Sequence, residues 1–350
     1  MKLSFSTRGW RNLPWQDQVR DASEMRFQGV EVYNLHRCTS LTAKGGAFER
    51  FRRNETLREL RENNLVIPCL DTSINLGDPG EDISPVDFLL DTAASMHIPY
   101  LAFCALTDDE NLIRERIMQL LPAAQDKKIC LLIKTVGIYA NTERLRLLLD
   151  SYASDYLAAL WDMHHPFRDF HEKPDTTIRN LGGYVRHVHL RDSDDNLQYN
   201  LIGEGTIPVQ DMMNALYSID YSGFISLEWK PEWIADIPDR EIIFSHFLNY
   251  MNRFENPKGK KKSLYFNHDG TGKFVWKKDE LIDLTFGQVL DRMVEEFPDQ
   301  YAFKYTTLDY IRTYAEFRDD VDRFARALIS LGVRTGTKVA IWPPTFRHGI

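Results

Sequence analysis

Short apolar runs alternate with stretches of helical period along the first 255 residues, and this alternation constrains the fold more than any other feature. The runs are rich in β-branched and aromatic residues, which predicts strands. The eight predicted strands are 2–6, 29–34, 65–70, 99–104, 129–134, 156–162, 185–190 and 224–229. Eight strands, each followed by a helix, over roughly 250 residues predict a closed (β/α)8 TIM barrel. The alternative is an open doubly wound sheet, which normally carries GxGxxG after its first strand; this sequence does not.

The stretches between the strands have the caps expected of barrel helices. Residues 141–152 begin with Asn141, a preferred N-cap, and place Glu143 in the first turn, where an acidic side chain is favourable. Residues 85–97 open on a proline suited to a first helical turn. Residues 239–254 form the last predicted helix of the barrel, which therefore spans residues 1–255.

The composition changes after residue 255. Residues 256–263 contain a proline, a glycine and a run of lysines, which predicts an exposed basic linker. A hairpin is expected around Asp269-Gly270, followed by two amphipathic helices and a short strand within 338–344. The second helix carries one apolar stripe, made of Phe317, Val321, Phe324, Ala325 and Leu328. Residues 264–350 are therefore predicted to form a separate small α+β segment.

Charge and composition exclude several classes of protein. The net charge of −8 disfavours a general nucleic-acid or membrane-surface binder. No apolar run approaches the roughly 20 residues that span a bilayer, and the N-terminus lacks the features of a signal peptide. The four cysteines form no CxxC pair and are predicted to be free thiols. We therefore expect a cytoplasmic protein with no nucleic-acid or membrane partner.

Ionisable residues end four consecutive predicted strands. Lys134 ends the fifth, Asp162 the sixth and Glu228 lies near the end of the eighth, while His187 and His189 share one face of the seventh. The active site of such a barrel lies at the carboxyl ends of its strands. Carboxylates and imidazole suit Mn²⁺, Mg²⁺, Zn²⁺ or Co²⁺, so Asp162, His189 and Glu228 are candidate ligands of a divalent metal.

Four motifs, "WDMHHP", "HVHLRD", "IGEGTIPVQDMMNAL" and "YSGFISLEWKPE", occur in an order that resembles the xylose-isomerase-like barrels. The resemblance covers residues 1–255. It implies isomerase, epimerase or dehydratase chemistry, with a metal on Asp162, His189 and Glu228, and with His165 contacting substrate hydroxyls. Glu228 would also be the catalytic base. In the epimerase branch a glutamate ends strand five, and Lys134 stands in its place.

Lys134 leaves four interpretations open. Its ammonium replaces the metal and pairs with Asp162 and Glu228, so that metal binding is weakened or lost. Alternatively, the metal stays and Lys134 is an acid or base with a lowered pKa. In a third interpretation Lys134 forms a Schiff base with a carbonyl substrate. In the fourth its side chain points into solvent.

The remaining expectations concern the ligand. Arg191 and Lys230 follow the ligands of strands seven and eight, where they either bind a carboxylate or phosphate of the substrate or are ordinary loop charges. The resemblance implies a small polar, hydroxylated substrate and proton abstraction next to its carbonyl. Endonuclease activity, known in another branch, is disfavoured by the acidic net charge. The oligomeric state, including a homodimer, stays open.

The C-terminal segment has a resemblance of its own. "TYAEF", "ARALISLGV" and "GTKVAIWPP" resemble the beginning of the AMP-forming acyl-CoA synthetases, the acyl-adenylate-forming ligases. The phosphate-binding loop and catalytic lysine of that family are absent here, so we expect a truncated ligase segment that does not adenylate. A second hypothesis for the whole chain follows: a catalytically degenerate barrel that binds a ligand or regulates an attached ligase.

Overall fold

The structure is a computed structural model, and it describes residues 1–234, 239–255, 284–305 and 310–340. The linker predicted at 256–263 and the hairpin predicted around Asp269 lie outside these residues. The chain divides into two compact units, one holding the predicted barrel and the other the C-terminal helices. Each unit is described by itself. Among the described residues, no helix combines the length and the apolar character needed to cross a membrane.

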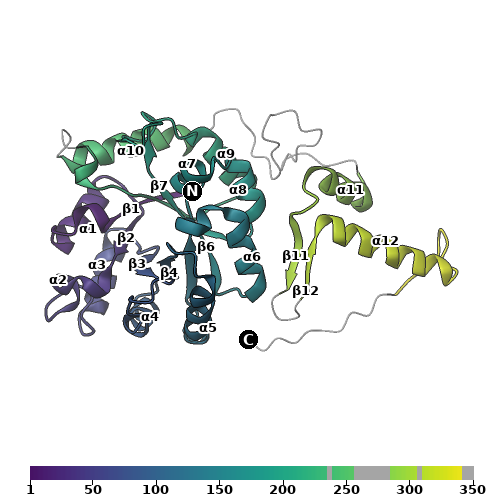
Figure 1. Ribbon diagram of the computed structural model, residues 1–350, viewed down its shortest axis with the longest axis horizontal. Coiled ribbons are helices and arrows are strands. Elements are labelled where there is room, and N and C mark those ends of the chain that lie inside the picture. The colour runs from purple at the N-terminus through teal and green to yellow at the C-terminus, as the bar shows by residue number, and fades with distance from the viewer. Residues whose placement is uncertain (235–238, 256–283, 306–309, 341–350) are drawn as a thin grey trace. The chain divides into compact units, whose positions relative to one another are not determined.

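The first unit is a closed barrel of eight parallel strands, as the alternation predicted (Figure 1). The strands are β1 (Lys2–Ser6), β2 (Gly29–Tyr33), β3 (Leu70–Asn75), β4 (Tyr100–Cys104), β5 (Cys130–Lys134), β6 (Leu157–Asp162), β7 (Val185–Leu190) and β10 (Phe224–Leu227). β10 pairs with β1 and closes the ring, with Lys2 opposite Phe224. All eight carboxyl ends therefore meet at one mouth.

Helices surround the strands (Figure 1). They are α1 (Trp15–Glu24), α2 (Thr39–Thr42), α3 (Arg53–Glu62), α4 (Pro85–Ser95), α5 (Glu110–Asp126), α6 (Thr142–Tyr152), α7 (His164–Phe170), α8 (Pro174–Leu181), α9 (Val209–Ser218) and α10 (Arg240–Glu255). The predicted cap of α6 is confirmed, because the Asn141 side chain accepts a hydrogen bond from the Arg144 amide.

The third predicted strand, 65–70, is wrong in its position. The strand β3 begins at Leu70, where the predicted one ends, and runs through polar residues to Asn75. Its pairing with β4 shifts register between Asp71 and Asn75, and Ser73 has a φ of 60°. A bulge of this kind re-aims side chains at the end of a strand. Asp71 precedes the shift and lies opposite Ala102 of β4, at a position where the apolar pattern gave no reason to expect a carboxylate.

The barrel interior changes from apolar to charged along the strands. One face of β5 carries Cys130, Leu132 and Lys134, because side chains two residues apart in a strand share a face. Cys130 and Leu132 belong to a buried apolar cluster with residues of β4 and β6. Lys134 lies one layer higher, at the carboxyl end. The apolar layers thus form a floor beneath a charged mouth.

The second unit holds α11 (Phe286–Glu296), β11 (Tyr301–Tyr305), β12 (Tyr310–Thr313) and α12 (Tyr314–Ser330). The strands β11 and β12 pair with each other. Both helices begin with a capping box, at Thr285 and Thr313. A short strand was expected within 338–344; residues 338–340 form none, and the rest lies outside the described part.

Candidate active site

Lys134 is buried at the carboxyl end of β5 and forms an ion pair with Asp71. Its Nζ donates to Asp71 Oδ2 over 2.8 Å, and 4% of its side chain and none of the Asp71 side chain is exposed. The interpretation that Lys134 points into solvent is therefore wrong, and so is its expected pairing with Asp162 and Glu228. Burial by itself would lower the pKa of Lys134, but the Asp71 carboxylate outweighs burial and raises that pKa.

The charge state of Lys134 limits what it can do. A lysine that forms a Schiff base or acts as a base at neutral pH needs a lowered pKa, because only the neutral amine is nucleophilic or basic. The Asp71 carboxylate shifts the pKa in the opposite direction. Lys134 is therefore suited to act as a fixed cation that donates hydrogen bonds to a substrate oxygen.

Arg191 bridges the two carboxylates predicted as metal ligands. One guanidinium nitrogen donates to Asp162 Oδ2 over 2.7 Å, and the other bonds with Glu228 Oε2. All three side chains are at most 5% exposed. Burial alone would raise the pKa of Asp162, but the Arg191 guanidinium overcomes it and holds that pKa well below its usual range. Asp162 is therefore an ionised partner of Arg191.

Arg8 bonds with the other oxygen of Glu228, Oε1. It lies in the short turn after β1, and this turn packs closely on the residue that follows Glu228. A Cβ on Gly9 would lie 2.6 Å from the Trp229 carbonyl oxygen, so only glycine allows this approach. Both Glu228 oxygens are consequently bonded to guanidinium groups.

His187 and His189 share one face of β7, as predicted, and both point at Glu31 on β2. The Nε2 atoms of the two rings lie 2.5 and 2.9 Å from Glu31 Oε2, and all three side chains are fully buried. Burial lowers the pKa of His187. Burial would raise the pKa of Glu31, but the two imidazoles hold it low. The bond to Glu31 thereby fixes the His189 ring through Nε2. The other ring nitrogen, Nδ1, lies 4.0 Å from Glu228 Oε1.

Two groups of donors among the described residues lie close enough together to be tested as metal sites. The first consists of Asp71, His189 and Glu228. Both of its carboxylates are already bonded to side-chain cations, namely Lys134, Arg191 and Arg8. A divalent ion there would face three positive charges at close range, which opposes binding. Asp162 lies in neither group.

The second group consists of Glu31, His187 and His189. Ligand atoms about 2.1 Å from a tetrahedral ion lie roughly 3.4 Å apart. The two Nε2 atoms are 2.5 and 2.9 Å from the Glu31 oxygen, which is hydrogen-bond spacing. As arranged here, neither group fits a divalent ion.

The other predicted contacts lie around the mouth without entering this cluster. His165 is on α7, and its Nδ1 pairs with Asp169 Oδ2 over 2.8 Å. Lys230 follows β10, with its Nζ 5.9 Å from the centre of the Trp233 ring. Burial and the neighbouring Arg8 lower the pKa of Lys230. Arg191 is thus an internal bridge, whereas Lys230 remains at the rim.

A carboxylate holds the loop that follows β7. Asp192 accepts hydrogen bonds from the amides of Ser193, Gly203, Gly205 and Ile207. Its carboxylate therefore ties "HVHLRD" to "GEGTIP", the two motifs that carried much of the sequence resemblance. The bonds fix the backbone just after Arg191, which bridges the two carboxylates.

Sequence reasoning missed three members of the cluster: Arg8, Glu31 and Asp71. The predicted candidates came from strands five to eight alone. Glu31 carried a signal, because a lone carboxylate inside the apolar run "GVEVY" costs free energy unless it is paired. Asp71 was hidden by the misplaced third strand, and Arg8 lies in a turn with no pattern of its own.

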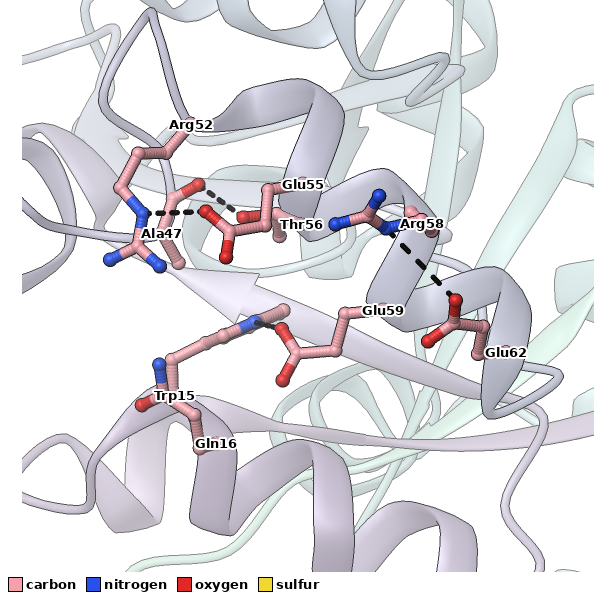
Figure 2. Close-up of a pocket in the computed structure, with 9 residues that line it drawn as sticks. All are labelled: Trp15, Gln16, Ala47, Arg52, Glu55, Thr56, Arg58, Glu59 and Glu62. Atoms are coloured by element: carbon pink, nitrogen blue, oxygen red, sulfur yellow. Dashed lines mark hydrogen bonds and ion pairs between the residues drawn. The ribbon is translucent and has the colours of Figure 1, made fainter.

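A separate hollow lies between α1 and α3, away from this cluster (Figure 2). Its lining is dominated by charged helix residues, and Glu59 accepts a hydrogen bond from the Trp15 indole nitrogen over 3.2 Å. Arg52 pairs with Glu55, and Arg58 with Glu62, within α3 and its N-terminal turn. We interpret it as a groove between two barrel helices.

Comparison with known proteins identifies the family. Residues 19–245 match the family described as "Xylose isomerase-like TIM barrel", and the chain belongs to that family. Fructoselysine 3-epimerase of Escherichia coli O157:H7 is 23% identical over 251 residues, which cover 65% of this chain and 90% of the epimerase. The structure of the IOLI protein, described with a bound zinc atom, has a TM-score of 0.61 and 14% identity. That likeness covers 74% of this chain and all of the other.

The C-terminal segment matches a second family. Residues 290–348 match the family described as "AMP-binding enzyme". The mitochondrial medium-chain acyl-CoA ligase ACSF2 of Mus musculus is 31% identical over 64 residues. These residues are 18% of this chain and 10% of the ligase. The resemblance of the segment to acyl-CoA synthetases is confirmed, and it concerns a small part of such an enzyme.

Proposed function

We propose that the barrel is an isomerase or epimerase that moves a proton next to the carbonyl of a small hydroxylated substrate without a divalent metal. One observation carries the proposal: in the group of Asp71, His189 and Glu228, both carboxylates are bonded to side-chain cations. Asp71 is bonded to Lys134, and Glu228 to Arg191 and Arg8. The similarity to fructoselysine 3-epimerase supports the same class of chemistry.

The proposed step uses the groups of the mouth as follows. A substrate oxygen takes the place of the Glu228 carboxylate on one guanidinium, and Glu228 is released as the base. Glu228 removes the proton from the carbon next to the carbonyl, the C–H electron pair forms a C=C bond, and the π pair of the carbonyl moves to its oxygen. The resulting enolate oxygen is stabilised by the N–H groups of Lys134 and Arg191, which are preorganised and buried. Returning the proton to the former carbonyl carbon, while the hydroxyl proton of the adjacent carbon passes to the enolate oxygen, gives the isomer.

Hydrogen exchange tests this step directly. The full chain is incubated with fructoselysine and with common ketohexoses in D₂O, and deuterium at carbon is measured by mass spectrometry. We expect incorporation that persists in EDTA and is lost in Glu228→Gln. Glu62→Gln, which removes an exposed carboxylate of α3, is the control and should behave as wild type. Absence of exchange with all of these substrates would count against the proposal.

Metal affinity tests the role of Lys134. We expect weak Mn²⁺ binding by the wild-type protein in titration calorimetry, and at least tenfold tighter binding by Lys134→Glu. This variant removes a cation and adds a carboxylate to the mouth. Lys128→Glu, an exposed change just before β5, should leave the affinity unchanged. Tight Mn²⁺ binding by the wild type, with no gain in Lys134→Glu, would show that a metal occupies the mouth.

A second function is favoured by the two guanidinium bonds that Glu228 makes. With both oxygens on arginines, the barrel also suits a non-catalytic module that binds a ligand for a ligase. Ligand binding without any carbon-bound deuterium would favour this function. The activity of the ligases is not transferred to this chain, because the matching segment is 10% of their length.

A further inference from the structure

A polar hollow of about 240 Å³ lies at the carboxyl ends of β1 and β2. Its lining includes Thr7, Arg11, Asn12, Gln18, Tyr33 and Asn34, with residues of the following loop up to Leu41. The hollow is larger than the roughly 150 Å³ cavity that admits benzene in another protein. It can therefore hold a functional group of a substrate together with several of its carbons.

The hollow adjoins the catalytic cluster through one aromatic ring. The guanidinium of Arg11 lies 4.5 Å from the centre of the Tyr33 ring, and that of Arg8 lies 5.3 Å from it. Arg8 is also bonded to Glu228. A substrate with its reacting carbon beside Glu228 would need to extend only past Arg8 to enter the hollow.

The charge of the lining selects the kind of group that fits. The hollow is lined by two arginines and by no carboxylate. Arg37 is bonded to Glu81 over 2.7 Å, whereas Arg11 has no ion pair among the described residues. A guanidinium presents forked donors that match the oxygens of a carboxylate or a phosphate. The hollow therefore favours an oxyanion.

The lining also offers an acceptor for a hydroxyl group. Asn34 is 8% exposed, and its Oδ1 has no hydrogen-bond partner in the described part of the chain. A buried acceptor without a partner costs free energy, and a ligand donor would remove that cost. Arg11 and Asn34 together suit a group that carries an anion next to hydroxyls.

We infer that this hollow binds the acidic end of the substrate, a carboxylate or phosphate held by Arg11, while the polyhydroxy end lies at Glu228. The inference rests on the proposed function, because it names the substrate class of that site. It makes the substrate an acidic ketose rather than a neutral one.

Matched ligands test the inference by binding alone. The affinities of D-fructose, D-fructose 6-phosphate and D-fructuronate for the full chain are measured by titration calorimetry. We expect at least one of the acidic ketoses to bind about tenfold or more tightly than fructose, as a charged hydrogen bond implies. D-Fructose 6-phosphate tests whether the hollow binds a phosphate, and D-fructuronate tests whether it binds a carboxylate.

Two variants locate the effect. In Arg11→Gln the preference for the acidic ketose should fall below about threefold, while in Arg58→Gln, an exposed change on α3, it should be retained. Equal affinity for all three ligands, failure of all three to bind, or a preference that survives Arg11→Gln would each overturn the inference.

Failure of this inference can be distinguished from failure of the proposed function. Binding preference needs no turnover, so it can be measured in Glu228→Gln as well. If the preference is present and hydrogen exchange is absent in the wild type, the hollow binds an acid in a barrel that does not catalyse. If exchange occurs with neutral ketoses and no preference is seen, the function stands and the hollow is not an acid subsite.

Discussion

Lys134 is held by one contact that accounts for its charge state. Its ammonium and the Asp71 carboxylate are both buried, so removing either one leaves an uncompensated charge in the interior. We predict that Lys134→Met lowers the free energy of unfolding by about 3 kcal/mol or more. In Lys134→Met/Asp71→Asn, part of this loss should be recovered, because no lone charge remains. Urea denaturation of the four proteins of this double-mutant cycle measures the coupling.

A matched control for this cycle is the exposed pair Lys127–Asp91. Their atoms lie 2.6 Å apart, yet the Asp91 side chain is 64% exposed. Water screens such a pair, and Lys127→Met should cost under about 1 kcal/mol. A coupling between Lys134 and Asp71 no larger than that of this surface pair would contradict their burial as an ion pair.

His164 makes the stability of the barrel depend on pH. It is 4% exposed and bonded to Ser193 Oγ, and burial lowers its pKa to about 3. In the unfolded chain its pKa is about 6.5, so acid protonates the unfolded state first. The contribution of His164 to the free energy of unfolding is fully present above about pH 6.5. It is lost as the pH falls toward 3. The expected loss is about 2 kcal/mol between pH 7.5 and pH 5.

Comparison of wild type and His164→Gln isolates this contribution. Other groups titrate equally in both proteins, so the difference in their unfolding free energies should shrink or reverse from pH 7.5 to pH 5. Urea unfolding at the two pH values measures it. A difference that is the same at both values would mean that His164 is not buried as a neutral ring.

Residue identities at the mouth were only partly predictable. The strand ends named Lys134, Asp162, His189 and Glu228 correctly as neighbours of one opening, because parallel strands share their carboxyl edge. Their partners could not be read from the pattern. Arg191 lies just after β7, outside the apolar run, and Asp71 belongs to the polar part of β3, outside the predicted third strand.

At the scale of elements, strand periodicity succeeded wherever a strand is apolar throughout. Seven of the eight barrel strands lie within the predicted ranges, as β5 and β6 show, being buried along their whole length. The exception is β3, where Asp71, Thr72 and Ser73 interrupt the apolar pattern. Three consecutive polar residues break the apolar run that identifies a strand.

The loop between β7 and α9 depends on the Asp192 carboxylate. Four backbone amides donate to it, and an amide side chain offers only one acceptor oxygen. We predict that Asp192→Asn speeds amide hydrogen exchange at residues 203–207 at least tenfold, while the barrel strands exchange as before. Asp194→Asn, a change at a half-buried carboxylate of the same loop, is the control. Unchanged exchange at 203–207 would show that the loop is fixed by other contacts.

At the scale of the whole molecule, the two units differ in how much apolar surface they bury. The barrel is closed and has its own core, with side chains such as Phe5, Leu132 and Trp161 almost completely buried. In the second unit only Leu290 and Met293 are buried hydrophobic residues among those described. Along the predicted stripe of α12, Phe324 is 64% exposed. Sequence predicted that stripe from its period, but a period cannot show whether a face is covered.

Because the barrel core lies within the first 255 residues, its stability should not depend on the C-terminal segment. We predict that a chain of residues 1–255 unfolds in urea with the same midpoint and slope as the full chain, followed by tryptophan fluorescence. The slope of the unfolding free energy against urea concentration scales with the surface exposed on unfolding. Equal slopes would therefore mean that the barrel accounts for the whole transition. A fall in the midpoint equivalent to more than about 1 kcal/mol would show that the segment stabilises the barrel. It would also favour the interpretation of the barrel as a module that acts together with a ligase.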